Sequence, residues 1–372
     1  MLLAFTIVLL LILIGLISGM FMFWSLPTPQ DIEKKQKNPF LSIIIPARNE
    51  AHRLPILLES LKHQNLKAYE VIVVDDKSDD QTVELAKNYG ATVYPNTAIN
   101  NVDSGKAIAC ANGASHAKGE WLLFLDADVK FEESNSLEKL LSSYQNQKSK
   151  GILSVQPYHK VEKRYENLSA VFNIIVLTGV NVFTYWKSKF KTAGSFGPCI
   201  LCDKKSYFQT GGHAWAEESI MDDFALSKLF LNENLPVTNY GGKGIISLRM
   251  YSGGVRELIE GWTKNLATAS QSTHPLVMTL INLWIFGALL ATSLPLVALL
   301  IGEFLFITLS LTAYVFYSIQ TAVHAKKAGN FKKRIFIFYP VLFLFFIGVF
   351  IYSLYRTHVL RSVMWKGRKI KV

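Results

Sequence analysis

Four long segments of this chain carry no charged side chain, and they constrain its fold more than any other feature. They are residues 1–24, 276–302, 304–323 and 335–355. About 20 consecutive apolar residues suffice for a helix to cross a bilayer, and a helix satisfies its own backbone hydrogen bonds in lipid. Hydrophobic residues make up 50% of the chain, and the excess lies in these segments. The sequence therefore predicts membrane helices near both ends and a globular domain between them.

Basic residues beside these segments indicate an orientation. Lys34, Lys35 and Lys37 follow the first segment, and residues 326–334 carry further Lys and Arg side chains between the third and the fourth. Because Lys and Arg concentrate on the cytoplasmic side of membrane proteins, we expect a multi-pass protein of the cell membrane with a cytoplasmic middle domain. The first segment has neither a basic stretch before it nor a small-residue cleavage site. We therefore expect a retained anchor and not a removed signal peptide.

The fourth segment conflicts with this orientation. If residues 335–355 crossed the bilayer completely, the basic tail at 356–372 would lie outside, against the bias of Lys and Arg toward the cytoplasm. Either this segment is re-entrant or interfacial, or one of the earlier segments does not span. The sequence alone leaves these alternatives open.

The formal net charge of +11 points to a membrane surface and not to nucleic acid. The basic residues lie beside apolar segments, which suits anionic lipid headgroups, whereas the middle domain has no basic stripe with interleaved aromatics. The three cysteines, Cys110, Cys199 and Cys202, lack a second pair or nearby histidines at zinc-ligand spacing. We expect reduced thiols and no zinc site.

The chain thus divides into five predicted parts. They are an N-terminal transmembrane anchor at 1–24, a linker at 25–39, a globular domain at 40–274, membrane-embedded helices at 275–355 and a basic tail at 356–372.

Within the middle domain, short apolar runs alternate with helical patterns. Strands are predicted at 41–46, 71–74, 91–94, 121–125, 151–157, 196–201 and 237–238, and helices at 54–61, 82–89, 106–116, 131–150 and 256–264. Alternation of this kind predicts βαβ units and parallel strands. Residues 165–186 are apolar but interrupted by polar side chains, and they predict one or two helices that pack on the sheet or lie at the bilayer surface.

Acidic residues follow two of the predicted strands. Asp75 and Asp76 end the strand at 71–74, and Asp126 and Asp128 come directly after the strand at 121–125. Alternation along an extended chain would point Asp126 and Asp128 to the same side. Hard divalent cations prefer such oxygen ligands and are commonly shared with substrate phosphates. Since ligands of α/β sheets bind at the carboxyl ends of strands, these acids predict a metal–nucleotide site; an Asp-rich turn is the alternative.

Four motifs stand in a specific order. They are Ser-Ile-Ile-Ile-Pro-Ala-Arg-Asn-Glu at 42–50, Val-Val-Asp-Asp-Lys-Ser-Asp-Asp at 73–80, Gly-Lys at 105–106 and Asp-Ala-Asp at 126–128. In this order they closely resemble glycosyltransferase family 2, over roughly residues 40–270. The resemblance implies an α/β fold of the GT-A type, a Rossmann-like mixed sheet flanked by helices. It also implies an inverting transferase that uses a nucleotide-diphosphate sugar with Mn²⁺ or Mg²⁺.

The same resemblance implies roles for individual residues. Asp126 and Asp128 would bind the metal ion, and Asp126 and Ala127 would also contact the donor. Pro46, Ala47 and Glu50 would line the nucleoside pocket. Asp76 would accept a hydrogen bond from uracil, and Lys106 would bind phosphate or uracil oxygens. The stretch Asp-Asp-Phe-Ala-Leu at 222–226 resembles the family's Glu-Asp-x-x-Leu base motif, with Asp in place of the usual Glu. Asp223 is the general-base candidate and Asp222 its runner-up. His213, Trp262 and Lys264 are candidate contacts to acceptor, sugar or phosphate. Of the family's Gln-x-x-Arg-Trp motif only Trp262 is present, and Arg256 and Lys264 are candidates to replace its missing arginine.

Structural alternatives compete with several of these roles. Asp76 could cap a helix near Ser78, Lys106 could be a solvated lysine, and Glu50 could be a surface acid or a partner of Arg48. His213 could be a structural turn residue, Trp262 a core aromatic, and Asp222 or Asp223 part of an ordinary helix face.

A narrower resemblance concerns the transferases of staphyloxanthin (carotenoid) biosynthesis. It is carried by residues 89–94, 153–159, 181–183, 196–198, 211–213, 260–264 and 364–368. It implies UDP-glucose as donor and, as acceptor, a C30 carotenoid acid that becomes a glycosyl ester. A carboxyl group is already ionised at neutral pH and needs no base, so the acidic pair by itself favours a hydroxyl acceptor. A hydroxyl lipid (diacylglycerol, polyprenyl phosphate or a hydroxylated carotenoid), polysaccharide synthesis, and a non-enzymatic membrane scaffold are the alternatives.

Overall fold

The computed structural model describes residues 2–31, 40–98, 105–215, 222–269, 272–360, 362–365 and 368–371. The chain forms two compact units. The sheet unit comprises Pro27–His159 and Gly194–Arg249, and the helical unit comprises Met1–Leu26, Lys160–Ala193 and Met250–Val372. Residues 32–39 of the predicted linker and 366–367 of the tail lie outside the described residues.

The sheet unit is built on a seven-stranded sheet with the order β3-β2-β1-β4-β8-β6-β9. Its strands are β1 (Leu41–Ala47), β2 (Glu70–Asp75), β3 (Thr92–Pro95), β4 (Trp121–Leu125), β6 (Ile152–Gln156), β8 (Cys199–Asp203) and β9 (Val237–Gly241). The neighbours of β1 are parallel to it, whereas β8 runs antiparallel to both β4 and β6. The mixed sheet implied by the resemblance is therefore confirmed. The alternation of strands and helices did not predict that β8 runs antiparallel, because residues 160–193 of the helical unit separate β8 from the preceding strands.

Helices cover the sheet, most of them where the sequence predicts and with shifts at their ends, but the two short helices between residues 204 and 215 were not predicted. They are α2 (Leu54–Lys62), α3 (Thr82–Asn88), α4 (Lys106–His116), α5 (Ser136–Asn146), α7 (Lys204–Gln209), α8 (Gly212–Trp215) and α9 (Asp222–Asn232). A Cβ on Gly113 would lie 2.4 Å from Cγ2 of Ile44, so this glycine allows α4 to pack closely on β1. The buried run Ile43 to Ile45 supplies β-branched side chains to both faces of the sheet.

A second, three-stranded sheet was not predicted. Its order is β5-β10-β7, with β5 at Val129–Phe131, β10 at Ile246–Leu248 and β7 at Tyr158–His159. These strands are too short to give a pattern in the sequence. The predicted helix at 131–150 is correspondingly shorter, because β5 occupies its first residue and α5 begins at Ser136.

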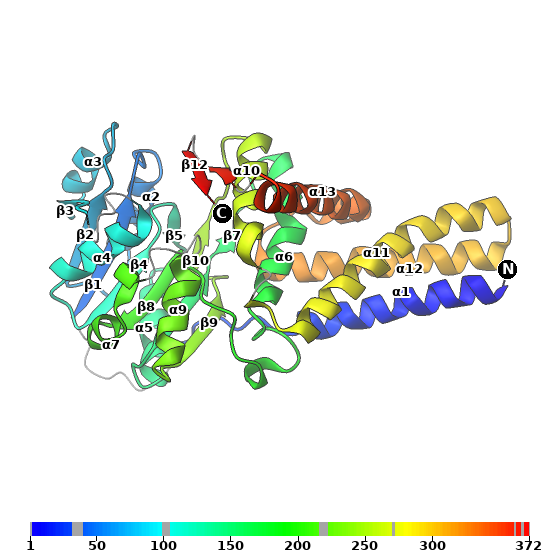
Figure 1. Ribbon diagram of the computed structural model, residues 1–372, viewed down its shortest axis with the longest axis horizontal. Coiled ribbons are helices and arrows are strands. Elements are labelled where there is room, and N and C mark those ends of the chain that lie inside the picture. Colours follow the sequence, from blue (N-terminus) through cyan, green and yellow to red (C-terminus); the bar gives the residue numbers. More distant parts are fainter. Residues whose placement is uncertain are drawn as a thin grey trace. The chain divides into compact units, whose positions relative to one another are not determined.

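The helical unit contains the apolar segments. Its elements are α1 (Leu2–Met22), η1 (Arg164–Ser169), α6 (Ala170–Gly179), η2 (Lys187–Lys189), α10 (Val255–Ala269), α11 (Pro275–Ile301), α12 (Phe304–Ala328), η4 (Lys333–Phe338), α13 (Tyr339–His358), β11 (Ser362–Trp365) and β12 (Arg368–Lys371). In the part of the chain that the structure describes, four helical segments are long and apolar enough to cross a membrane. In Figure 1, α1, α11 and α12 run side by side. Helix α6 packs on α11, α12 and α13, so the part of residues 165–186 that forms it contacts the apolar helices.

Small residues bring α1 close to its neighbours. A Cβ on Gly15 would lie 2.1 Å from Oη of Tyr317 and 3.0 Å from Cα of Gly287. Nearby, Nε2 of Gln320 donates a hydrogen bond to the Leu16 carbonyl at 2.7 Å. Close backbone approach and interhelical hydrogen bonds are the forces that hold helices together in lipid, so both tie α1 to α11 and α12.

Replacing Gly15 by leucine is therefore expected to destabilise the helical unit. Overpacking of this kind costs about 1–3 kcal/mol, and the melting temperature in detergent should fall measurably. Gly348→Leu is the matched control, because a Cβ there meets no atom within 4 Å. Equal melting temperatures for the two variants would contradict the packing argument.

Candidate active site

The predicted site residues of the sheet unit come from the ends of β1, β2 and β4 and the starts of α4 and α9. Asp126 and Asp128 lie in the turn between β4 and β5, not in the strand. Strand alternation therefore does not apply to these two side chains, and the argument that it would point them to the same side loses its basis. The turn contacts the loop that precedes β8, because the Asp126 N–H donates a hydrogen bond to the Pro198 carbonyl at 3.1 Å. Both carboxylates are half-buried, and Ala127 between them is buried.

Lys106 lies between one acid that follows β4 and one acid at the start of α9. Its Nζ lies 2.8 Å from Oδ1 of Asp126 and 3.7 Å from Oδ1 of Asp223. Lys106 is the first residue of α4, and Gly105 before it has a φ of 125°, a conformation that glycine adopts without strain. The structure thus brings together three residues predicted from separate motifs.

Asp223 is positioned from both its backbone and its side chain. Its carbonyl accepts hydrogen bonds from the hydroxyls of Ser195 and Ser227, each at 2.9 Å. A Cβ on Gly197 would lie 1.8 Å from Oδ2 of Asp223, so only glycine leaves room for this carboxylate. These three contacts could not be predicted from sequence, where only the motif Phe-Gly-Pro at 196–198 drew attention to this region. The side chain of Asp222 lies outside the described part of the structure.

Asp76 is held by a buried polar network. Its Oδ1 accepts a hydrogen bond from Nδ2 of Asn96 at 2.8 Å, and its Oδ2 lies 3.6 Å from the guanidinium of Arg48. Asn96 accepts in turn from Nδ2 of Asn112 at 2.8 Å. The alternative that Asp76 caps a helix near Ser78 does not hold, because the Ser78 N–H donates its hydrogen bond to Oδ2 of Asp75. The network fixes Asp76 at the carboxyl end of β2 and identifies Asn96 and Asn112 as supporting residues that sequence reasoning missed.

Replacing Asn112 by leucine is expected to destabilise the sheet unit. The change removes the partner of the buried Asn96 amide, and an unsatisfied buried polar group costs about 1–3 kcal/mol. Each kcal/mol corresponds to a fall of roughly 2–4 °C in melting temperature for a unit of this size. Asn88→Leu, on the exposed end of α3, is the control and should melt like the unaltered protein. If Asn112→Leu had the same melting temperature as the unaltered protein, the network would not contribute to the stability of the sheet unit.

The end of β1 and the loop after it carry the remaining donor-site candidates. Ala47 is buried and its carbonyl accepts from the Asp76 N–H at 2.8 Å, while Pro46 is half-buried. The Glu50 N–H donates to Oγ1 of Thr82 at 2.9 Å, and the Glu50 carboxylate lies 3.5 Å from Arg53. The pairing of Glu50 with Arg48 considered from sequence is therefore not the one observed here. These contacts place the loop beside Asp76.

His213 lies within the core of the sheet unit. Its Nδ1 and its backbone N–H lie 3.0 and 3.1 Å from the Tyr207 hydroxyl, and its ring packs edge-on against Phe124 of β4. Burial, reinforced by the positive charge of Lys106, lowers the pKa of His213 to about 3. The imidazole is therefore neutral at physiological pH. It belongs to the short helix α8, where the sequence predicted a turn.

Trp262 and Lys264 belong to α10 of the helical unit. Trp262 is 2% exposed, stacks on Phe172 at 4.8 Å, and donates its indole N–H to the Ser169 hydroxyl at 3.0 Å. Lys264 is half-buried. The contacts of Trp262 are those of a core aromatic.

The available ligands suit a cation that is shared with a substrate. Among the residues that the structure describes, no group of three or more His, Cys, Asp or Glu side chains could hold a metal ion. Asp126 and Asp128 offer oxygen ligands alone, which hard cations prefer, and Mg²⁺ commonly completes such a set with substrate phosphates. The chemistry of this donor pair therefore fits a divalent cation bound together with a diphosphate.

Comparisons with known proteins show the family and the fold of this chain. Residues 42–207 match the family model described as Glycosyl transferase family 2. The chain is 39% identical over 335 residues to 4,4'-diaponeurosporenoate glycosyltransferase of Staphylococcus aureus (strain USA300), an alignment that covers 89% of this chain and 88% of the relative. Among solved structures it is similar to mannosyltransferase PcManGT from Pyrobaculum calidifontis in complex with GDP-Man and Mn²⁺. That similarity has a TM-score of 0.53 and 15% identity, and covers 95% of this chain and 97% of the other. Both resemblances found in the motifs are confirmed.

Proposed function

The chain belongs to glycosyltransferase family 2, and we propose that it transfers glucose from UDP-glucose to a membrane-borne C30 carotenoid acid, forming a glycosyl ester. The observation that carries this proposal is the position of Lys106 between Asp126 and Asp223. Lys106 lies between Asp126, an acid expected at the diphosphate, and Asp223, an acid expected at the reacting sugar. The acceptor is taken from the relative, whose name specifies diaponeurosporenoate.

The donor end of the site would be formed by the sheet unit. Asp76, held by Asn96, would accept from the uracil edge, with Pro46, Ala47 and Glu50 beside the nucleoside. Asp126 and Asp128 would hold Mn²⁺ or Mg²⁺ together with the diphosphate. When bound, such a cation neutralises the charge of the departing diphosphate as a Lewis acid. Lys106 would add a positive charge at the helix N-terminus, where anions are favoured.

The transfer itself would be a single displacement. An oxygen of the acceptor attacks the anomeric carbon from the face opposite the diphosphate, the bond from that carbon to the diphosphate oxygen breaks, and its electron pair leaves with UDP. A carboxylate acceptor has no proton to lose, so Asp223 or Asp222 would orient the sugar. A hydroxyl acceptor must lose its proton, and Asp223 would then serve as general base.

The apolar helices support an enzyme that works at a membrane. Four candidate spans lie in the helical unit, which suits an acceptor dissolved in the bilayer and a donor dissolved in water. With the basic residues taken as cytoplasmic, the protein is a multi-pass protein of the cell membrane with its catalytic site facing the cytoplasm.

Transfer assays with the full-length protein in detergent micelles test the proposal. Radiolabelled UDP-glucose, UDP-galactose and GDP-mannose are each offered with a C30 carotenoid acid, diacylglycerol or polyprenyl phosphate, with and without EDTA. The expected product is an alkali-labile glucosyl ester of the carotenoid acid, formed from UDP-glucose and abolished by EDTA. Transfer to a hydroxyl lipid alone would refute the acceptor, and transfer from another donor alone would refute UDP-glucose.

A further inference from the structure

The segment after α12 is long and apolar enough to cross a bilayer, but its contacts describe a different path. Its first residues lie beside a polar part of the helical unit. Oδ1 of Asn330 accepts from the Val161 N–H at 2.6 Å, and the Lys332 N–H donates to Oδ1 of Asn167 at 2.9 Å. Lys163 and Arg164, between these partners, are exposed. The segment therefore begins at a level where charged side chains reach water.

From there the chain runs back along α12. The Ser318 hydroxyl donates to the Phe336 carbonyl at 2.8 Å, and the Tyr314 hydroxyl donates to the Ile337 carbonyl at 2.5 Å. Tyr314 lies 14 residues before Ala328, the last residue of α12. At 1.5 Å per residue this is a depth of about 21 Å. The two hydroxyls also satisfy carbonyls of the irregular backbone, which is tolerated at membrane depth only with partners from the protein.

Helix α11 gives the same depth independently. The hydroxyl of Tyr339, the first residue of α13, donates to the Ala288 carbonyl at 3.4 Å. Ala288 lies 13 residues after Pro275, where α11 begins, a distance of about 20 Å along the axis. Since the apolar core of a bilayer is about 30 Å thick, the turn before α13 stops short of the far side.

Helix α13 then returns toward its starting level. Phe343 packs on Trp284, only nine residues into α11, and Phe346 packs on Phe172 of α6. Near its end, the Ser353 hydroxyl donates to the Thr263 carbonyl at 2.8 Å. Thr263 lies on α10, which also carries Glu257 and other charged side chains that a bilayer core would exclude.

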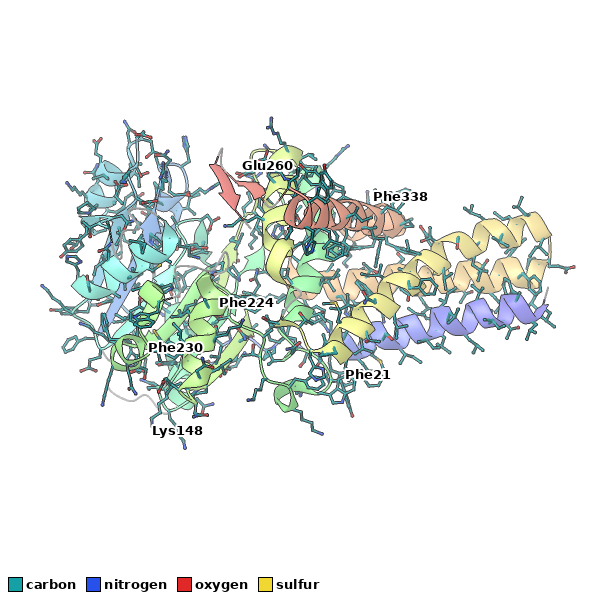
Figure 2. The ribbon with its side chains drawn as sticks, in the orientation of Figure 1. Phe21, Lys148, Phe224, Phe230, Glu260 and Phe338 are labelled. Atoms are coloured by element: carbon teal, nitrogen blue, oxygen red, sulfur yellow. The ribbon has the colours of Figure 1, made fainter. Side chains whose placement is uncertain are left out.

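We infer that residues 329–358 form a re-entrant hairpin, which enters the leaflet next to α10 and leaves on the same side. Its outward face would bind the acyl chains of that leaflet; this face consists of Phe338, Val341, Leu344, Ile351 and Tyr355, all exposed. Figure 2 labels Phe338 at the end of the hairpin that lies along α11 and α12, and Glu260 on α10 near its other end. The inference rests on the membrane association proposed above.

The hairpin removes the conflict in the charge pattern. Lys332, Lys333 and Arg334 near its start and Arg356 and His358 at its end would all lie on one side. With α1, α11 and α12 as the spans, the strands β11 and β12 also lie on the cytoplasmic side, as the bias of basic residues requires.

Spin-label depth measurements test the path. Single cysteines replace Phe338, Leu344, Ile351 and Val359, which are exposed to similar extents of 64%, 59%, 60% and 64%; the natural cysteines are buried. In full-length protein reconstituted in phosphatidylcholine–phosphatidylglycerol vesicles, immersion depth from oxygen and nickel-chelate collision rates should fall steadily from position 338 to position 359. A maximum at 344–351 would indicate a complete span and overturn the inference, as would uniformly shallow values. No immersion at any position, including Phe286→Cys near the middle of α11, would refute the membrane association itself.

Labelling in intact cells tests the sidedness. A membrane-impermeant maleimide is applied to His358→Cys, to Glu303→Cys in the turn between α11 and α12, and to Lys62→Cys in the sheet unit. Glu303→Cys should react in intact cells, whereas His358→Cys should react only after permeabilisation, like Lys62→Cys. Reaction of His358→Cys in intact cells would overturn the hairpin.

Discussion

Replacing Asp126 by asparagine is expected to lower the rate of sugar transfer by about two to three orders of magnitude. The variant keeps the shape of the side chain but loses an anionic ligand of the proposed cation. It also loses the charge that holds Lys106 at 2.8 Å. A cation at a departing diphosphate contributes several kcal/mol, and about 1.4 kcal/mol corresponds to a tenfold change in rate. Initial rates at saturating UDP-glucose, measured across a Mn²⁺ titration, check this expectation.

The control for Asp126→Asn is Asp79→Asn. Asp79 is an exposed acid in the loop after β2, so its replacement makes the same change of charge away from the proposed cation. Its rate should stay within about twofold of the unaltered protein, as is usual for surface substitutions. If Asp126→Asn retained the Mn²⁺ response and most of the rate, Asp126 would not be a metal ligand. Circular dichroism and melting temperature show whether either variant is misfolded.

The central part of the fold is accessible from sequence because its signals are local. Each of these elements can be recognised from its own residues: β1, β2 and β4 are continuous apolar runs, and the long helices consist largely of charge-free segments. The small sheet does not, because β7 has two residues and β5 and β10 have three each. The direction of β8 depends on how residues 160–193 leave the sheet unit and return. That information is tertiary, and no periodicity in the strand records it.

The candidate site divides in the same way. Acids at strand ends and a lysine opening a helix could be named from motifs, and the structure brings Lys106, Asp126 and Asp223 together. Asn96 and Asn112 could not be named, because an amide in a loop and another inside a helix belong to no motif. Gly197 was visible only as part of a resemblance, and its purpose depends on the close approach of the Asp223 carboxylate.

Replacing Asp223 by asparagine is expected to separate the two classes of acceptor. With a carotenoid acid the transfer rate should stay within about tenfold, because an ionised carboxyl has no proton for a base to remove. With an alcohol acceptor the rate should fall by about 10²–10⁴, the usual contribution of general-base catalysis. Both rates are measured on one preparation, so that loss of protein or of donor binding would lower them equally.

The control for this experiment displaces the carboxylate without neutralising it. In Gly197→Ala the new methyl group would meet Oδ2 of Asp223 at 1.8 Å, so the side chain must move away from its place beside Lys106. If Asp223 acts as a base, Gly197→Ala should impair alcohol acceptors as strongly as Asp223→Asn does and should spare the carotenoid acid. A large, equal loss with both acceptors in Asp223→Asn, with donor affinity unchanged, would contradict the proposed division of roles. Asp223 would then contribute to breaking the bond to the diphosphate, a step that both acceptors share.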